Sequence, residues 1–119
     1  MADDRIRERL RHMLDAITAI ERLTGGKTIA DYGKNPDMAA AIERYIERLS
    51  EASRHVPADL KALQPQIEWR GVADVGNVLR HTYDQVSDRR VWQIITDDLA
   101  PLRSAVEELL NKISTAKTS

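Results

Sequence analysis

The feature that most constrains the fold is an unbroken helical spacing of apolar residues near the start of the chain. At about 100° per residue, apolar positions that recur every three or four residues fall on one side of an α-helix. Asp3 or Asp4 is placed to cap this helix, and Gly25-Gly26 to end it. We therefore expect a long amphipathic first helix, whose apolar seam consists of Ile6, Leu10, Met13, Leu14, Ile17, Ile20 and Leu23.

The rest of the chain repeats this spacing in shorter stretches. A turn at Asn35-Pro36-Asp37 predicts a second helix that ends before Pro57. The later elements expected are a loop with one helical turn between Pro57 and Pro65, a helix from near Trp69 to about Tyr83, a helix capped by Ser87-Asp88, a break or kink at Asp97, Asp98 and Pro101, and a last helix that ends near Ile113.

No stretch alternates in the manner of a strand, and no internal repeat is visible. The chain of 119 residues is predicted to be a single helical domain over residues 1–113, with a frayed polar tail over 114–119. Its fold class is all-α, an up-and-down bundle of four main helices plus short ones.

Composition excludes several classes of function. The chain has no cysteine, which excludes disulfides and thiolate metal sites. It shows neither a signal peptide nor an apolar run long enough for a membrane span, so we expect a cytoplasmic protein with no membrane partner. A net charge of −1 argues against a protein that binds nucleic acid through an overall positive charge, although local basic patches are still possible.

One segment carries a polar stripe that packing alone does not require. Arg70, Asp74, Asn77 and His81 are separated by four, three and four residues, with Tyr83 just beyond. On a helix these four side chains fall within about 60° of one another. A guanidinium, a carboxylate, an amide and an imidazole on one face can bind a phosphate group and transfer a proton.

The residues around this stripe resemble a known family. Trp69-Arg70, Gly76 to Tyr83 and Val91 to Ile95 follow one another in the order and spacing typical of the HepT-like family of the HEPN superfamily, as do Ala19 to Gly26 and Leu49 to Ala52 upstream. The resemblance covers nearly the whole chain, from about Arg5 to Leu110.

This resemblance implies a dimeric helical bundle that cleaves RNA without a metal or another cofactor. It also implies a place in a toxin–antitoxin pair, in which an MntA-like nucleotidyltransferase antitoxin silences the toxin by transferring AMP to a motif tyrosine. The family motif is Arg, Asn, three variable residues, His, one variable residue and Tyr. Asn77, His81 and Tyr83 match it, but Gly76 stands where the motif has arginine.

The missing guanidinium has two candidate replacements. Arg70 shares a helical face with His81, whereas Arg80 points about 100° aside and could serve the site of a second subunit. His81 is the candidate for proton transfer, Asn77 for orienting the imidazole or a phosphate oxygen, and a pair of His81 residues at a dimer interface could divide the acid and base roles. Loss of the arginine together with activity is the competing interpretation.

Three further positions have two interpretations each. Tyr83 is either the AMP acceptor or an interfacial aromatic residue. Glu51 is either a buried carboxylate that supports His81 or an arginine, or an ordinary surface glutamate. Gly76, Arg80 and Tyr83 lie on a third, otherwise solvent-facing side of their helix, where a small residue permits a close crossing by a second copy. By contrast, His12 and His55 are predicted to be surface residues, and Trp69 and Trp92 core or interface anchors.

The sequence thus leaves three functions open. The first is a ribonuclease toxin that acts as a homodimer on an RNA substrate. The second is a non-catalytic, dimeric partner of a nucleotidyltransferase, and the third is a helical scaffold that only dimerises.

Overall fold

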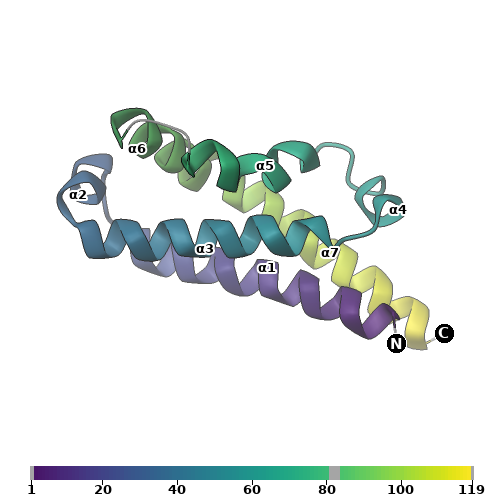
Figure 1. Cartoon of the computed structure of the whole chain (residues 1–119). Helices are drawn as coiled ribbons and strands as arrows, with labels where there is room; N and C mark the ends of the chain where they lie inside the picture. Colours follow the sequence, from purple (N-terminus) through teal and green to yellow (C-terminus); the bar gives the residue numbers. More distant parts are fainter. Residues whose placement is uncertain (1, 81–83, 119) are drawn as a thin grey trace.

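The computed structural model describes residues 2–80 and 84–118, and these residues form helices joined by short connections (Figure 1). No strand occurs in these two ranges. The elements are α1 (Ala2–Thr24), α2 (Ile29–Lys34), α3 (Pro36–Arg54), α4 (Ala58–Lys61), α5 (Trp69–Arg80), α6 (Asp84–Gln93), the π-helical segment η1 (Ile94–Asp98) and α7 (Leu99–Thr118).

The long helices run alternately in opposite directions. Figure 1 shows α1 and α3 lying side by side, α5 returning along α3, and α6, η1 and α7 leading back to the end of the molecule where the chain begins. Helix α3 packs against both α1 and α5, while α7 packs against α1. The prediction of an all-α, up-and-down bundle is confirmed, and the bundle measures 50 × 26 × 24 Å.

The core is mainly aliphatic, and most of its side chains come from α1, α3, α6 and α7. The seam predicted for α1 is confirmed, because Leu10, Met13, Ile17 and Ile20 are fully buried. They meet side chains from the facing helices, among which the most deeply buried are Ile42, Ile46, Val91, Leu99, Val106 and Leu109. Burial of this apolar area is the main favourable contribution to folding.

Helix α1 ends as predicted but begins differently. Thr24 is its last residue, and Gly26 has a φ of 74°, a left-handed conformation that glycine adopts without strain. At the other end the helix already includes Ala2, so the prediction that Asp3 or Asp4 caps it was wrong. Both carboxylates lie in the first turn, where they interact favourably with the helix dipole.

The turn after α1 holds a short helix, α2, which was not among the elements predicted from the sequence. Thr28 caps α2, because its hydroxyl accepts a hydrogen bond from the amide of Asp31. In return, the Asp31 carboxylate accepts a hydrogen bond from the amide of Thr28 at 2.8 Å. The hydrogen bond from the Thr28 amide, and to a lesser extent one with the Thr28 side chain, lowers the pKa of the Asp31 carboxyl. Such a reciprocal capping box satisfies two amides that would otherwise lack partners.

Tyr32 fixes α2 against α3 and α6. Its ring is buried, lies 5.9 Å from the ring of Trp92 and donates a hydrogen bond from its hydroxyl to Glu43 at 3.3 Å. Burial raises the pKa of Tyr32, and Glu43 and Asp88 raise it further, so the hydroxyl stays protonated and able to donate. Trp92 packs against the core as predicted.

The chain from α6 to α7 is one continuous helical run with a widened turn. Pro101 lacks an amide proton and crowds the carbonyl of Asp97, which explains a local departure from α geometry. The helix widens into η1, where the amide of Leu99 bonds to Ile94 and the hydroxyl of Thr96 bonds to the carbonyl of Trp92 at 3.0 Å. The predicted break or kink at Asp97, Asp98 and Pro101 is therefore a π turn without a break in the helix.

Two boundaries in this half of the chain differ from those expected. Helix α6 begins at Asp84, so Ser87 and Asp88 lie inside it and do not cap it. Helix α7 continues to Thr118, past Ile113, near which the last helix was predicted to end.

Replacing Ile46 with Ala is expected to lower the free energy of unfolding by about 2–5 kcal/mol, because this side chain is fully buried and its removal leaves a cavity. Chemical denaturation measures the change. The matched control is Ile29→Ala, since Ile29 is 40 % exposed and its truncation should cost less than about 1 kcal/mol. Equal losses in the two variants would contradict the assignment of the core.

Candidate active site

Helix α5 presents the described part of the polar stripe to solvent. Arg70, Asp74 and Asn77 are all exposed, whereas Val75 on the opposite side is buried. The amide of Asn77 donates a hydrogen bond to the Asp74 carboxylate at 3.3 Å. The carboxylate thus orients the amide, and Arg70 lies two turns nearer the start of the helix.

The remaining predicted site residues of this segment are His81, Tyr83 and Arg80. His81 and Tyr83 lie outside the described residues. Arg80 is the last residue of α5, and its side chain also lies outside them. The catalytic and acceptor roles predicted for these three residues stay predictions.

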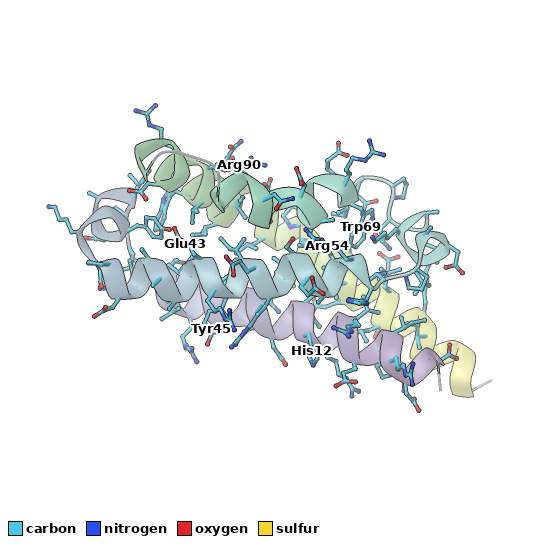
Figure 2. The ribbon with its side chains drawn as sticks, in the orientation of Figure 1. His12, Glu43, Tyr45, Arg54, Trp69 and Arg90 are labelled. Carbon is cyan, nitrogen blue, oxygen red and sulfur yellow. The ribbon has the colours of Figure 1, made fainter. Side chains whose placement is uncertain are left out.

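Trp69 anchors the beginning of α5. Its side chain is 9 % exposed, and its indole N–H donates to the carbonyls of Lys61 at 3.2 Å and Gln64 at 3.1 Å. The Lys61 ammonium lies 5.9 Å from the centre of the ring, within the range of a cation–π contact. This confirms the interpretation of Trp69 as a core anchor, which fixes where the stripe begins (Figure 2).

The middle of α5 is held by polar groups from α3. The carbonyl oxygen of Ala73 accepts three hydrogen bonds. They come from the Ser50 hydroxyl at 2.7 Å, from Nε of Arg54 at 3.0 Å and from Nη2 of Arg54 at 2.7 Å. In an α-helix this carbonyl points toward the amide of residue 77. Ser50 and Arg54 therefore bind α5 at the turn that carries Asn77.

A surface cavity of about 640 Å³ lies between α1, α3 and α5. We call it the α1–α3–α5 cavity. Its charged groups are four arginines, three carboxylates and one histidine, so guanidinium groups outnumber carboxylates. The residues that line it are Arg9, His12, Asp15, Ala16, Arg44, Tyr45, Glu47, Arg48, Ser50, Glu51, Ala52, Arg54 and Gly76.

Gly76 faces this cavity and not the bulk solvent. It is buried and shares the cavity wall with side chains of α1 and α3. The prediction that Gly76 is on a solvent-facing side of its helix was therefore wrong, whereas the close crossing by a second copy stays a prediction. The glycine lies where α5 packs against α3 within one chain.

Glu51 is not the buried carboxylate that was one of its two interpretations. Its side chain is 58 % exposed, and it lies 3.7 Å from Arg54 and 3.1 Å from His55. Its predicted support of His81 or of an arginine stays a prediction. His55 and His12 are both surface residues, as predicted, and His12 lies 3.7 Å from Glu8.

Three arginines of α3 that line this cavity had no predicted role, namely Arg44, Arg48 and Arg54. Arg44, Arg48, Glu51 and Arg54 follow one another by four, three and three residues, a helical spacing on the polar side of α3. This spacing was available as a signal. What it could not reveal is that the polar side of α3 adjoins α5.

The described residues form neither a metal site nor a membrane span. No group of three or more histidine or carboxylate side chains is arranged to hold a metal ion among them. None of the helices in the described ranges has the length and apolar character to cross a bilayer.

Comparison with known proteins identifies the family. The family profile described as "Ribonuclease HepT-like" matches residues 13–109. The protein named "Probable ribonuclease HepT" from Thermococcus cleftensis is 32 % identical over 100 residues, which cover 84 % of this chain and 91 % of that protein. The chain therefore belongs to the HepT-like ribonuclease family of the HEPN superfamily.

More distant relatives carry similar names. A protein of Caldanaerobacter subterraneus is 26 % identical, over 87 % of this chain and 92 % of its own length, and one of Methanocaldococcus jannaschii is 25 % identical, over 91 % and 89 %. Both are named "Putative RNase". No solved structure matches the chain with statistical significance.

Replacing Ser50 with Ala is expected to cost about 1 kcal/mol of unfolding free energy, because a buried hydrogen bond to the Ala73 carbonyl is lost. Chemical denaturation measures the change. The control is Ser104→Ala on the exposed side of α7, which should change the stability by no more than about 0.5 kcal/mol. A Ser50→Ala variant as stable as the control would show that this contact does not hold α5.

Proposed function

We propose that this chain is a metal-independent endoribonuclease and the toxin of a toxin–antitoxin pair. Two findings support the proposal. The chain belongs to the HepT-like ribonuclease family, and α5 presents Asn77 to solvent with its amide oriented by Asp74. Asn77 matches the family motif, and His81 follows it by one helical turn. We also propose that the protein acts in the cytoplasm, where an RNA substrate and an antitoxin are available.

The reaction is an internal displacement at phosphorus. A base removes the proton of a ribose 2′-hydroxyl, whose oxygen attacks the adjacent phosphorus. The bond from phosphorus to the 5′-oxygen then breaks, and an acid donates a proton to the leaving oxygen. The products are a 2′,3′-cyclic phosphate and a 5′-hydroxyl end.

His81 is the residue to which we assign proton transfer, because imidazole is the side chain whose ordinary pKa lies nearest neutral pH. In a homodimer, two copies of His81 at one composite site would divide the acid and base roles. Asn77 would orient a phosphate oxygen, with Asp74 holding its amide. Arg70 and Arg80 are the two arginines of α5 that could stabilise charge on the phosphate.

Tyr83 is the residue on which we place regulation. An MntA-like nucleotidyltransferase would transfer AMP from ATP to the Tyr83 hydroxyl oxygen and release pyrophosphate. The added phosphate and base would then block the RNA site by bulk and by negative charge. Tyr83 follows His81 by two residues in the motif.

One observation favours a second candidate function. Gly76 stands where the family motif has arginine, so this position supplies no guanidinium to stabilise the phosphorane. The alternative is a non-catalytic, dimeric partner of a nucleotidyltransferase. A nucleotidyltransferase gene beside this one is compatible with both candidates and would count against a mere scaffold.

Purified wild-type protein is expected to cleave single-stranded RNA in the presence of EDTA. His81→Ala should lower the rate by about 100-fold or more, because proton transfer is lost, and Asn77→Ala by about 100-fold, because a phosphate donor is lost. The measurement is gel analysis of end-labelled RNA, with Asn111→Ala, an exposed position on α7, as the matched control. Wild-type protein that leaves RNA intact would favour the non-catalytic candidate.

Incubation with the partner nucleotidyltransferase and ATP is expected to add one AMP to the wild-type protein and to stop RNA cleavage. Tyr83→Phe should gain no mass and should keep its activity, since phenylalanine has no acceptor oxygen. Mass spectrometry of the intact protein measures the addition. Tyr45→Phe on α3 tests whether another tyrosine is the acceptor, and modification of the Tyr83→Phe variant would overturn the assignment.

A further inference from the structure

The α1–α3–α5 cavity brings a cation from α3 to the place where α5 lacks one. Arg54 extends from the last turn of α3, and its guanidinium binds the carbonyl of Ala73 through Nε and Nη2 (Figure 2). Because that carbonyl points toward residue 77, the guanidinium lies beside the turn of Gly76 and Asn77. Gly76 and Arg54 line the same cavity.

Gly76 leaves room for this arrangement. A glycine has no side chain, so the cavity wall at position 76 is bare backbone. An arginine at that position would extend into the cavity that already holds Arg54, and two guanidinium groups would repel one another there. The glycine and the cross-helix arginine therefore fit together as one arrangement.

Arg54 keeps hydrogen-bonding capacity for a ligand. A guanidinium has five N–H donors, and its contacts with described residues engage the Nε, one N–H of Nη2 and the Nη1 that faces Glu51. The contact with Glu51 spans 3.7 Å between two half-exposed side chains, and a pair of that kind is weak. The outer edge of Arg54 is thus available for two parallel bonds to a phosphate.

The surroundings of Arg54 are also suited to an anion. Arg9, Arg44 and Arg48 lie in the same cavity, and the Arg48 guanidinium lies 5.4 Å from the centre of the Tyr45 ring. The carboxylates of Asp15, Glu47 and Glu51 offset part of this charge. With four guanidinium groups against three carboxylates, a phosphate that displaces Glu51 from Arg54 leaves the cavity closer to neutral.

We infer that the α1–α3–α5 cavity is a phosphate-binding site for an RNA strand, in which Arg54 of α3 supplies the guanidinium that position 76 lacks. This inference rests on the proposed ribonuclease function for the identity of its ligand. It assigns this contact to α3, whereas Arg70 of α5 does not line the cavity.

The test measures binding separately from cleavage. The probe is a short single-stranded RNA with 2′-O-methyl groups, which cannot form the attacking oxygen, and its affinity is measured by fluorescence anisotropy. Arg54→Gln keeps an N–H donor for the Ala73 carbonyl but removes the charge. It should weaken binding about tenfold and lower the dependence of binding on salt. Arg22→Gln, an exposed position on α1 outside the cavity, should change affinity by less than about twofold.

A rescue variant separates a phosphate contact from a structural role. Arg54→Gln combined with Gly76→Arg returns a guanidinium to the cavity from α5, so it should regain most of the lost affinity. A purely structural loss would not be restored in this way. The inference is overturned if wild-type protein does not bind the probe, if Arg54→Gln binds as Arg22→Gln does, or if the double variant stays weak. Binding by wild type without cleavage of ordinary RNA would overturn the ribonuclease proposal alone.

Discussion

The contact between α3 and α5 is the constraint on which the candidate site depends. Within it, Ser50 and Arg54 of α3 both donate hydrogen bonds to one backbone carbonyl of α5, that of Ala73. A carbonyl in mid-helix already lies near the amide four residues later, so the donors from α3 converge on a single turn of α5. That turn carries Gly76 and Asn77. The same side chains that join the two helices therefore also set the position of the polar stripe relative to α3.

Local patterns in the sequence were sufficient for most of the fold. The spacing of apolar residues from Ile6 to Leu23 predicted α1, and Gly25-Gly26 predicted its end, because both signals act within a few residues of chain. The errors at Asp3, Asp4, Ser87 and Asp88 share a cause. A residue that can cap a helix is equally acceptable in its first turns, where its charge also interacts with the dipole, so composition alone cannot fix a starting residue.

The site was predictable only along one helix. Arg70, Asp74 and Asn77 could be placed on one face, because helical spacing determines faces, and the structure shows all three exposed. The role of Arg54 depends on which helix lies beside α3, and no spacing within α3 states this. For the same reason Gly76 was assigned to solvent although it faces α3, and burial was considered for Glu51 although its partners are the exposed Arg54 and His55.

The π turn at Ile94–Asp98 has a consequence for the geometry of the whole second half of the chain. A π turn closes its hydrogen bond over one residue more than an α turn. Its extra residue sets α6 and α7 out of phase by about 100°, the rotation of one position. Because of this offset, α6 packs against α2 through Trp92. Helix α7 then turns a different side, which carries Val106 and Leu109, toward α1. The number of residues in the π turn thus determines which side of α7 is turned toward α1. Deleting one residue there would rotate α7 relative to α6 without breaking the helix.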